Sequence, residues 1–169
     1  MIEKLFPDLY VKSIYELPLE MLQNKGIKVL VFDIDNTISP YDVAEPDEET
    51  LELFQYFRKK GFKICLLSNN NKKRVNLFNR RLKAAAVYKA GKPGAKKLIE
   101  AIGKMGFSPK EAAVIGDQVF TDVLCGHNAG AFAIYSEPMC ERDQLVTKVK
   151  RPMDRFVMGI YKRRNGIWK

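Results

Sequence analysis

The sequence predicts an α/β protein built on a mainly parallel, five-stranded sheet. Two observations carry this prediction: short apolar runs alternate with stretches of helical periodicity, and the apolar runs are followed by polar residues. Strands that alternate with helices pair in parallel through right-handed crossovers. The clearest run is 29–32, four apolar residues that lead directly into Asp33 and Asp35. A chain of 169 residues is long enough for one domain with a sizeable core.

The elements follow one another along the chain in a regular order. The first 26 residues predict an N-terminal arm, a short helix or extended segment that packs on the body, and Gly26 ends it. Five strands are then expected at 28–34, 62–67, 86–88, 112–115 and 131–135. The helices between them are expected at about 46–60, 72–82, 93–105 and 119–128.

Local residues justify where these elements begin and end. Pro46 and the three acidic residues after it suit a first helical turn, since negative charge there meets the positive end of the helix dipole. Pro93 is expected at the first position of a helix that Gly106 stops. The run at 29–32 is apolar at every position, which is typical of a strand covered on both faces.

The end of the chain predicts a basic amphipathic helix over residues 148–169. Its apolar residues from Asp154 onward are expected on one face: Phe156, Val157, Ile160 and Tyr161. The net charge is +9, and eight basic residues against one acidic residue give this stretch +7 of it. The apolar face can dock on the body or on lipid. The charge favours an anionic partner, with a membrane surface ranked above nucleic acid.

Composition narrows the classes of protein. No apolar run is long enough to span a bilayer, and the first residues lack a secretory signal. Cys65, Cys125 and Cys140 have no metal-ligand spacing, so we interpret them as reduced thiols of a cytosolic protein, with Cys65 a small hydrophobe on a strand. The lone histidine, His127, is expected at a surface or helix end.

Polar side chains gather where the strands end. Asp33 and Asp35 follow the first strand, Ser68 follows the second, Lys92 comes soon after the third, and Asp117 follows the fourth. The carboxyl ends of parallel strands share one edge, where open α/β sheets bind ligands. Close carboxylates repel unless a cation or a proton intervenes. This set suits a phosphate, with a divalent metal on the carboxylates and phosphoryl oxygens on the hydroxyl and the ammonium.

In order along the chain, Asp33-Ile-Asp35-Asn-Thr37, Ser68, Lys92 and Gly116-Asp117-Gln-Val-Phe-Thr-Asp122 resemble the four motifs of the haloacid dehalogenase (HAD) superfamily of phosphohydrolases. The resemblance covers residues 28–135. It implies a three-layer Rossmann-like fold and a Mg²⁺-dependent phosphomonoesterase that works through a phospho-aspartate.

The same resemblance implies a role for each motif residue. Asp33 would be the nucleophile, and Asp35 the general acid and then base. Mg²⁺ would lie on Asp33, the backbone carbonyl of Asp35, and Asp117, with Asp122 supporting it directly or through water. The remaining motif residues are expected to bind the substrate phosphate: Thr37, Ser68, Asn69 and Lys92. Lys92 would also neutralise charge on the transferring group.

A closer resemblance is carried by the leader Pro7-Asp-Leu-Tyr, the Asp-x-Asp-Asn-Thr form of the first motif, Leu67-Ser-Asn-Asn and the Gly-Asp-Gln-x-x-Thr-Asp form of the last. These are similar to the YqeG branch of HAD subfamily IIIA, which resembles the phosphatidylglycerophosphate phosphatases of mitochondria and plastids. The implied substrate is a lipid phosphomonoester, hydrolysed to phosphatidylglycerol and phosphate.

Motif spacing leaves no room for a substantial cap domain. Only 30 residues separate Thr37 from Ser68, and 23 separate Ser68 from Lys92. An open site suits a bulky substrate, or a second subunit covers it in a homo-oligomer. The expected organisation is an arm at 1–26, a phosphatase domain at 27–147 and the basic helix at 148–169. The protein is expected in the cytoplasm, free or peripheral on the inner face of the membrane.

Two other classes of function stay open. A receiver-like phosphoacceptor also gathers acids, a hydroxyl and a lysine around Mg²⁺. It has no use, however, for an acid/base two residues past the acceptor, and it carries its acceptor on the third strand. An RNA- or ribosome-associated protein would use the basic tail, but the sequence has no nucleic-acid-binding motif.

Overall fold

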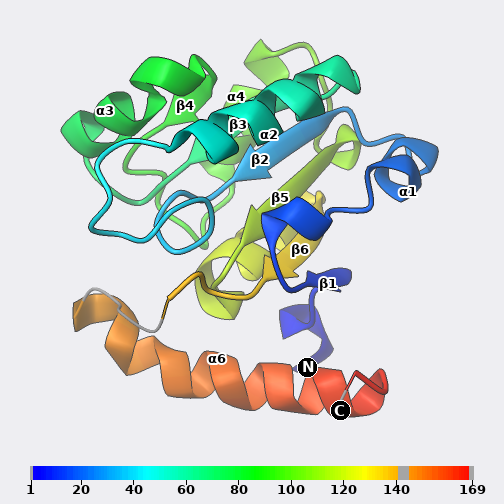
Figure 1. The fold of residues 1–169 in the computed structure, drawn as a ribbon. Helices are drawn as coiled ribbons and strands as arrows, with labels where there is room; N and C mark the ends of the chain where they lie inside the picture. The colour runs from blue at the N-terminus through cyan, green and yellow to red at the C-terminus, as the bar shows by residue number, and fades with distance from the viewer. Residues whose placement is uncertain (1, 141–144, 168–169) are drawn as a thin grey trace.

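The computed structural model describes residues 2–140 and 145–167, and for residue 2 and residues 145–150 it describes the backbone alone. Its centre is a six-stranded sheet flanked by helices (Figure 1). The strands are β1 (Leu9–Val11), β2 (Val29–Phe32), β3 (Lys63–Leu67), β4 (Ala85–Val87), β5 (Ala112–Gly116) and β6 (Phe132–Ser136). Their order is β1-β6-β5-β2-β3-β4, with all neighbours parallel.

Helices and single turns connect the strands. The α-helices are α1 (Leu19–Asn24), α2 (Glu48–Lys59), α3 (Lys72–Leu82), α4 (Lys96–Lys104), α5 (Leu124–Ala129) and α6 (Leu145–Arg164). The turns are η1 (Ile2–Leu5), η2 (Ile14–Glu16), η3 (Pro109–Glu111) and η4 (Val119–Val123). The residues that the structure describes thus form an α/β fold on a parallel sheet, as the sequence predicts.

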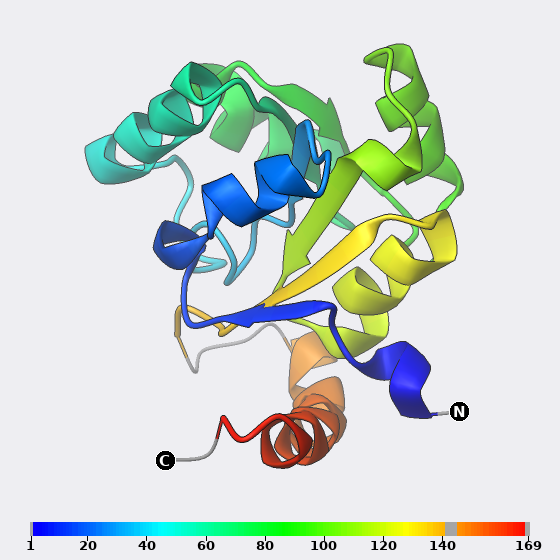
Figure 2. The same ribbon diagram turned by 90° about the vertical axis from the view of Figure 1, so that its right-hand side faces the viewer.

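The expected count of five strands is wrong by one. The additional strand, β1, comes from the N-terminal arm and pairs in parallel with β6 at the edge of the sheet, Leu9 opposite Ile134 and Val11 opposite Ser136 (Figure 2). It is three residues long between two 3-10 turns, and only Val11 is fully buried. Such a short segment has too little alternation to be recognised in sequence.

The central strand β2 is buried on both faces, as its unbroken apolar run predicts. Leu30 and Phe32 pack on the side of α1, α2 and α3, whereas Val29 and Val31 pack on the side of α4 and α5. Side chains alternate along a strand, so four consecutive apolar residues supply both cores. Packing between helices on both faces of the sheet fixes the position of β2 and of its C-terminal end.

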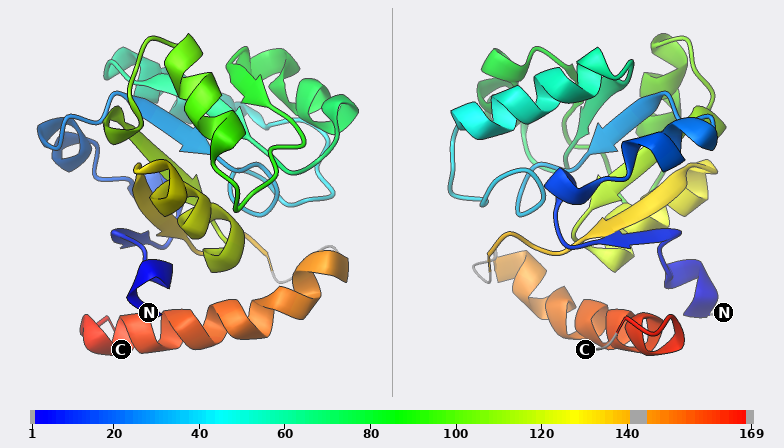
Figure 3. Two further views of the ribbon diagram at one scale, coloured as in Figure 1. Left: turned by 180° about the vertical axis from the view of Figure 1, so that it is seen from behind. Right: turned by 45° about the vertical axis from the view of Figure 1, so that its right-hand side comes forward.

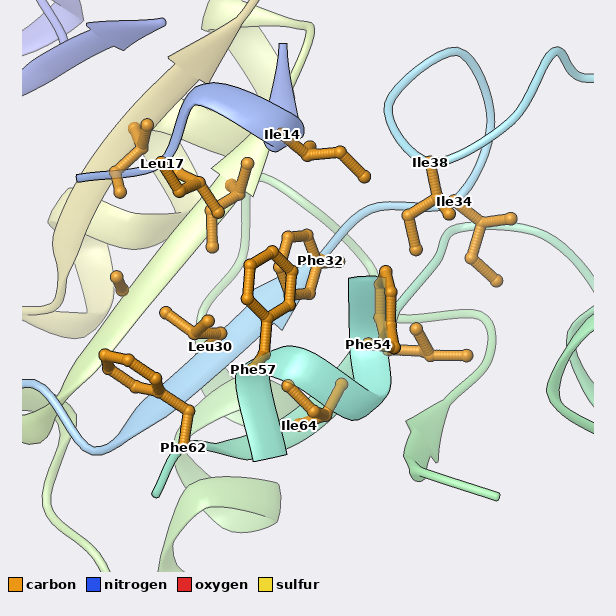
Figure 4. Close-up of a cluster of buried hydrophobic side chains, with 14 of the residues drawn as sticks. Ile14, Leu17, Leu30, Phe32, Ile34, Ile38, Phe54, Phe57, Phe62 and Ile64 are labelled. Carbon is orange, nitrogen blue, oxygen red and sulfur yellow. The ribbon is translucent and has the colours of Figure 1, made fainter. Parts of the chain in front are cut away.

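An aromatic cluster holds that end of β2 in place. The rings of Phe32, Phe54 and Phe57 have centroid separations of 4.9, 5.7 and 5.8 Å and are almost fully buried (Figure 4). Aromatic pairs at these separations add about 0.5–1.5 kcal/mol each beyond area burial. Phe32 directly precedes Asp33, so the cluster anchors the backbone from which the first motif departs.

The C-terminal helix α6 runs along the β1/β6 side of the molecule, opposite α2 and α3 (Figure 3). It begins at Leu145, earlier than expected. Its Val157, Met158 and Tyr161 pack on η4 and β6. Phe156, predicted on this docked face, is instead 67% exposed.

The prediction went wrong because the buried face of α6 is not purely apolar. Arg151 and Asp154 lie on it, two turns and one turn, respectively, before Val157 and Met158. Of the basic tail, Lys148, Lys150 and Lys169 lie outside the described side chains. Among the residues that the structure describes, no helix is both long and apolar enough to cross a membrane.

Two loops after strands differ from each other in how well sequence predicts them. Asn71 caps α3, its Oδ1 accepting from Arg74 N at 2.9 Å, as the run of asparagines predicts. Pro93, by contrast, does not open a helix. Gly94 N donates to Gly91 O at 2.8 Å, which closes a turn, and α4 begins only at Lys96.

Candidate active site

Three buried carboxylates converge at the carboxyl ends of β2 and β5. Phe32 and Ile115 are partners in the sheet, so Asp33 and Asp117 emerge beside one another. Asp122 joins them from η4, and ligand atoms of the three carboxylates lie within 4.8 Å of each other. All three residues are buried.

A missing side chain lets Asp122 reach this position. A Cβ at Gly116 would lie 2.3 Å from the Asp122 side chain, so any other residue at 116 would displace the carboxylate. The chain then passes through a π-helical turn, and Gln118 N donates to Asp122 Oδ2 at 3.1 Å. Turns of this kind are frequent at functional sites. The Gly-Asp start of the last motif therefore has a steric reason.

Lys92 is the cation at the centre of the cluster. Its Nζ donates to Asp33 Oδ1 and Asp122 Oδ1, both at 2.6 Å, and to Leu67 O at 3.1 Å. Burial alone would lower the pKa of Lys92, but the charges of Asp122 and Asp33 raise it above its ordinary value. The ammonium is therefore charged in the folded protein.

The loop that carries Lys92 is held by Asn69. Its Oδ1 accepts from Lys92 N at 2.9 Å, and its Nδ2 donates to Lys92 O at 3.3 Å. The Asn69 side chain thus positions the backbone of Lys92. Ser68 is buried, and its Oγ accepts from Asn70 N at 3.1 Å, which leaves its own proton available.

Asp117 is held from two sides. Thr37 Oγ1 donates to Asp117 Oδ1 at 3.0 Å, which ties the first motif to the last. Arg151 of α6 donates to Asp117 O at 2.7 Å and also contacts Oδ2. Burial raises the pKa of Asp117 to about 6, and the Asp122 charge acts in the same direction, while Arg151 and Thr37 oppose them.

The balance of buried charge favours a cation. Three carboxylates face two described cations, Lys92 and Arg151. Burial, together with the Asp122 and Asp117 charges, raises the pKa of Asp33 well above its ordinary value. Oxygen donors at this spacing are those that Mg²⁺ binds, so the residues fit such an ion. It would be held by Asp33, Asp117 and Asp122.

The side chain of Asp35 lies apart from this cluster. Its Oδ1 accepts from Arg74 at 2.9 Å and its Oδ2 from Asn70 Nδ2 at 3.3 Å. Both partners come from the segment that follows β3. Asp35 keeps 19% of its side chain exposed, against 8% for Asp33 and 1% for Asp122, so water reaches it more readily. The sequence groups Asp33 and Asp35, and the structure separates their side chains.

Sequence reasoning missed three residues around the site: Arg74, Arg151 and Asp154. Asp154 Oδ1 accepts from Val119 N at 2.9 Å and Phe120 N at 3.3 Å and so holds the start of η4. Arg151 and Asp154 are three apart on a helix, and the apolar Val157 and Met158 follow one turn after Asp154. That spacing on a docked face is the only signal that could have identified them.

His127 lies away from the carboxylates, near the end of α5, as expected. Its Nδ1 contacts Lys4 O at 2.8 Å and its Nε2 contacts Asp8 Oδ2 at 3.2 Å. The hydrogen bond to Asp8 raises the pKa of His127. The histidine therefore fastens the N-terminal arm.

The fold and the buried carboxylate cluster define a HAD-type phosphatase, a phosphoric monoester hydrolase. The chain belongs to the mitochondrial PGP phosphatase family, whose sequence model matches residues 2–139. It is 34% identical to the probable phosphatase YqeG of Bacillus subtilis (strain 168) over 99% of this chain and 98% of that protein. Phosphatidylglycerophosphate phosphatase 1, chloroplastic/mitochondrial, of Arabidopsis thaliana is 25% identical over 86% of this chain and 45% of that protein.

Solved structures support the fold. The cobalt-bound deoxy-D-mannose-octulosonate 8-phosphate phosphatase of Haemophilus influenzae matches with a TM-score of 0.53 and 12% identity, over 81% of this chain and 90% of that one. An uncharacterized protein from Listeria monocytogenes serotype 4b matches with a TM-score of 0.56 and 17% identity, over 70% and 84% of the two chains. At these identities the likeness concerns the fold alone.

Proposed function

We propose that the protein is a Mg²⁺-dependent phosphomonoesterase in which Asp33 is the nucleophile. The observation that carries this proposal is the contact of Asp33 with Lys92 at 2.6 Å inside a cluster of three buried carboxylates. Lys92, together with a metal held by Asp33, Asp117 and Asp122, would keep Asp33 ionised despite its burial. A metal there also reduces the repulsion between the carboxylate and an incoming phosphate dianion.

The reaction proceeds in two displacements. A carboxylate oxygen of Asp33 bonds to phosphorus as the bond to the leaving oxygen breaks, and Asp35 gives that oxygen a proton. Water then attacks phosphorus, Asp35 takes the proton back, and the bond to Asp33 breaks to release inorganic phosphate. Ser68 and the ammonium of Lys92 bind the phosphoryl oxygens. The partial exposure of Asp35 suits a leaving group that extends into solvent.

The proposed substrate is a lipid phosphomonoester of the phosphatidylglycerophosphate class. The family to which the chain belongs supports this, as does the outer surface of α6. That surface exposes the apolar Met153 and Phe156 together with Arg163 and Arg164. Each basic residue near an anionic membrane contributes about 1 kcal/mol to attachment. We place the protein on the inner face of a membrane, held weakly and reversibly.

Replacement of Asp33 by Asn tests the mechanism. Asp33→Asn keeps the side-chain shape and removes the nucleophile, so hydrolysis of an aryl phosphate and of phosphatidylglycerophosphate falls to background. The thermal midpoint serves as the check that the variant is folded. Wild-type protein quenched in acid during turnover retains labelled phosphate, and the variant does not. Unchanged turnover in the folded variant refutes the proposal.

A further inference from the structure

A groove of about 980 Å³ opens between α6, β1 and the segment after β6. Its size is at the upper end for small-molecule sites and far exceeds what a phosphoryl group needs. Two of its walls reach the candidate active site. Arg151, which lines it, contacts Asp117, and Cys140 donates from Sγ to Asn36 Oδ1 at 3.1 Å, between Asp35 and Thr37.

The groove combines positive charge with apolar surface. Four basic and two acidic side chains line it: Lys12, Arg151, Arg155, Lys162, Glu137 and Asp154. Lys162 pairs with Glu137 at 2.6 Å, and Arg151 pairs with Asp117. Lys12 and Arg155 are exposed and form no ion pair with any residue that the structure describes. The groove therefore presents two cations that suit an anion.

The rest of the lining is apolar or aromatic: Tyr10, Tyr135, Pro138, Met139, Met158 and Ile167. An acceptor is also present, because Asp154 is 1% exposed and its Oδ2 has no hydrogen-bond partner among the described residues. Buried polar atoms without a partner are rare, and a hydroxyl of a ligand or a water can satisfy this one. The groove therefore suits a ligand that combines an anionic group, a hydroxyl and a hydrocarbon part.

We infer that this groove binds the lipid part of the substrate. The second phosphate, in diester linkage, lies at Lys12 and Arg155, and its glycerol lies beside Asp154. The acyl chains begin on the tyrosine and methionine side chains of the groove. This inference rests on the proposed function, since it assumes that the terminal phosphate lies at Asp33. It makes α6 part of the substrate site. Phe156 and Met153, on the outer surface of the same helix, then face the membrane that holds the acyl chains.

Filling the groove tests the inference. Gly159 lines it, and a Cβ built there meets no heavy atom within 4 Å, so Gly159→Leu adds bulk without a clash. Leucine also favours a helix more than glycine does, so α6 should be retained. Gly103→Leu in α4 is the matched control, because Gly103 is equally open and lies outside the groove.

The measured quantity is kcat/KM for phosphatidylglycerophosphate in mixed micelles divided by kcat/KM for an aryl phosphate. Gly159→Leu lowers this ratio by about tenfold or more, since the aryl phosphate does not extend into the groove. Gly103→Leu leaves the ratio as in the wild type. An unchanged ratio in a folded Gly159→Leu protein overturns the inference. Phosphatidylglycerophosphate with its acyl chains removed must lose efficiency; if it does not, the apolar half of the groove plays no part.

Charge substitutions provide a second test that does not depend on the leucine variant folding. Arg155→Ala lowers the same ratio by about tenfold, the effect of losing one charge-assisted hydrogen bond. Arg163→Ala removes equal charge from the same helix outside the groove and leaves the ratio within about twofold of the wild type. Equal effects of the two variants point to general membrane attraction and contradict the inference.

The outcomes also separate the inference from the proposed function. If the wild type hydrolyses the aryl phosphate but not the lipid, the lipid assignment and the groove both fail and the phosphatase mechanism remains. If neither is hydrolysed, the proposed function itself fails. Competitive inhibition of aryl phosphate hydrolysis by single-stranded RNA, abolished by Arg155→Ala, assigns the groove to nucleic acid and overturns the inference.

Discussion

Two aspartates at the site are each paired with an arginine from a flanking helix, and the pairs differ in their surroundings. Asp35 meets Arg74 of α3, with side chains 19% and 14% exposed. Asp117 meets Arg151 of α6, with side chains 0% and 8% exposed. The chemistry is the same in both pairs, but water screens the first pair and not the second.

The difference separates two uses of an ion pair. The partly exposed Asp35–Arg74 pair can open more easily than the buried pair, because water reaches it and can replace a lost contact. The buried Asp117–Arg151 pair cannot open without leaving a carboxylate uncompensated, so it holds α6 against the sheet. Asp35, which we propose as the proton-transfer residue, lies in the first setting. A residue that would hold a metal lies in the second.

The largest effect on stability is expected from replacing Arg151. Arg151→Met leaves Asp117 buried without its cation and lowers the free energy of unfolding by about 3–5 kcal/mol. Methionine keeps an unbranched apolar stem in place of the arginine, so little volume is lost. Urea unfolding measured by circular dichroism, without divalent metal, gives the value. If the free energy of unfolding fell by less than about 1 kcal/mol, the buried pair would be no more stabilising than the partly exposed one, which would contradict the comparison.

Metal should reduce that loss. Mg²⁺ placed on Asp33, Asp117 and Asp122 supplies the charge that Arg151→Met removes, so it stabilises the variant more than the wild type. At a concentration one hundred times the dissociation constant, the linkage gain is about 2.7 kcal/mol for a site present only in the folded state. Thermal unfolding with and without Mg²⁺ measures it. Asp122→Asn is the control, and its unfolding should respond less to the metal.

Much of this site follows from sequence. The run at 29–32, the position of Asp33 and Asp117 at strand ends, and the asparagine cap of α3 all rest on local patterns. Arg151 could not be assigned in this way, because its partner lies 34 residues away and a charged residue on an amphipathic helix is usually solvated. The separation of Asp35 from Asp33 was hidden as well. It arises where the strand ends and the loop turns at Asn36, whose φ is 63°.

A smaller effect is expected at the partly exposed Asp35–Arg74 pair. Arg74→Met lowers the free energy of unfolding by about 1 kcal/mol or less, and the loss shrinks in high salt. Its effect on activity is larger than its effect on stability, since Asp35 loses the contact that orients it. The value of kcat therefore falls while the unfolding midpoint stays close to that of the wild type. Equal effects on stability from Arg74→Met and Arg151→Met would contradict the comparison.

The smallest effect concerns a third pair, Asp8 with His127, whose side chains are 40% and 24% exposed. The hydrogen bond to Asp8 raises the pKa of His127, so the stabilisation is complete below the histidine's unfolded pKa of about 6.5 and is lost as pH rises through the higher folded value. Asp8→Asn removes the charge and keeps an oxygen that can accept from Ala133 N. The difference in unfolding free energy between wild type and variant should be below about 1 kcal/mol at mildly acidic pH and should approach zero in alkali. A difference that grows with pH would contradict this prediction, because the histidine loses its positive charge as pH rises.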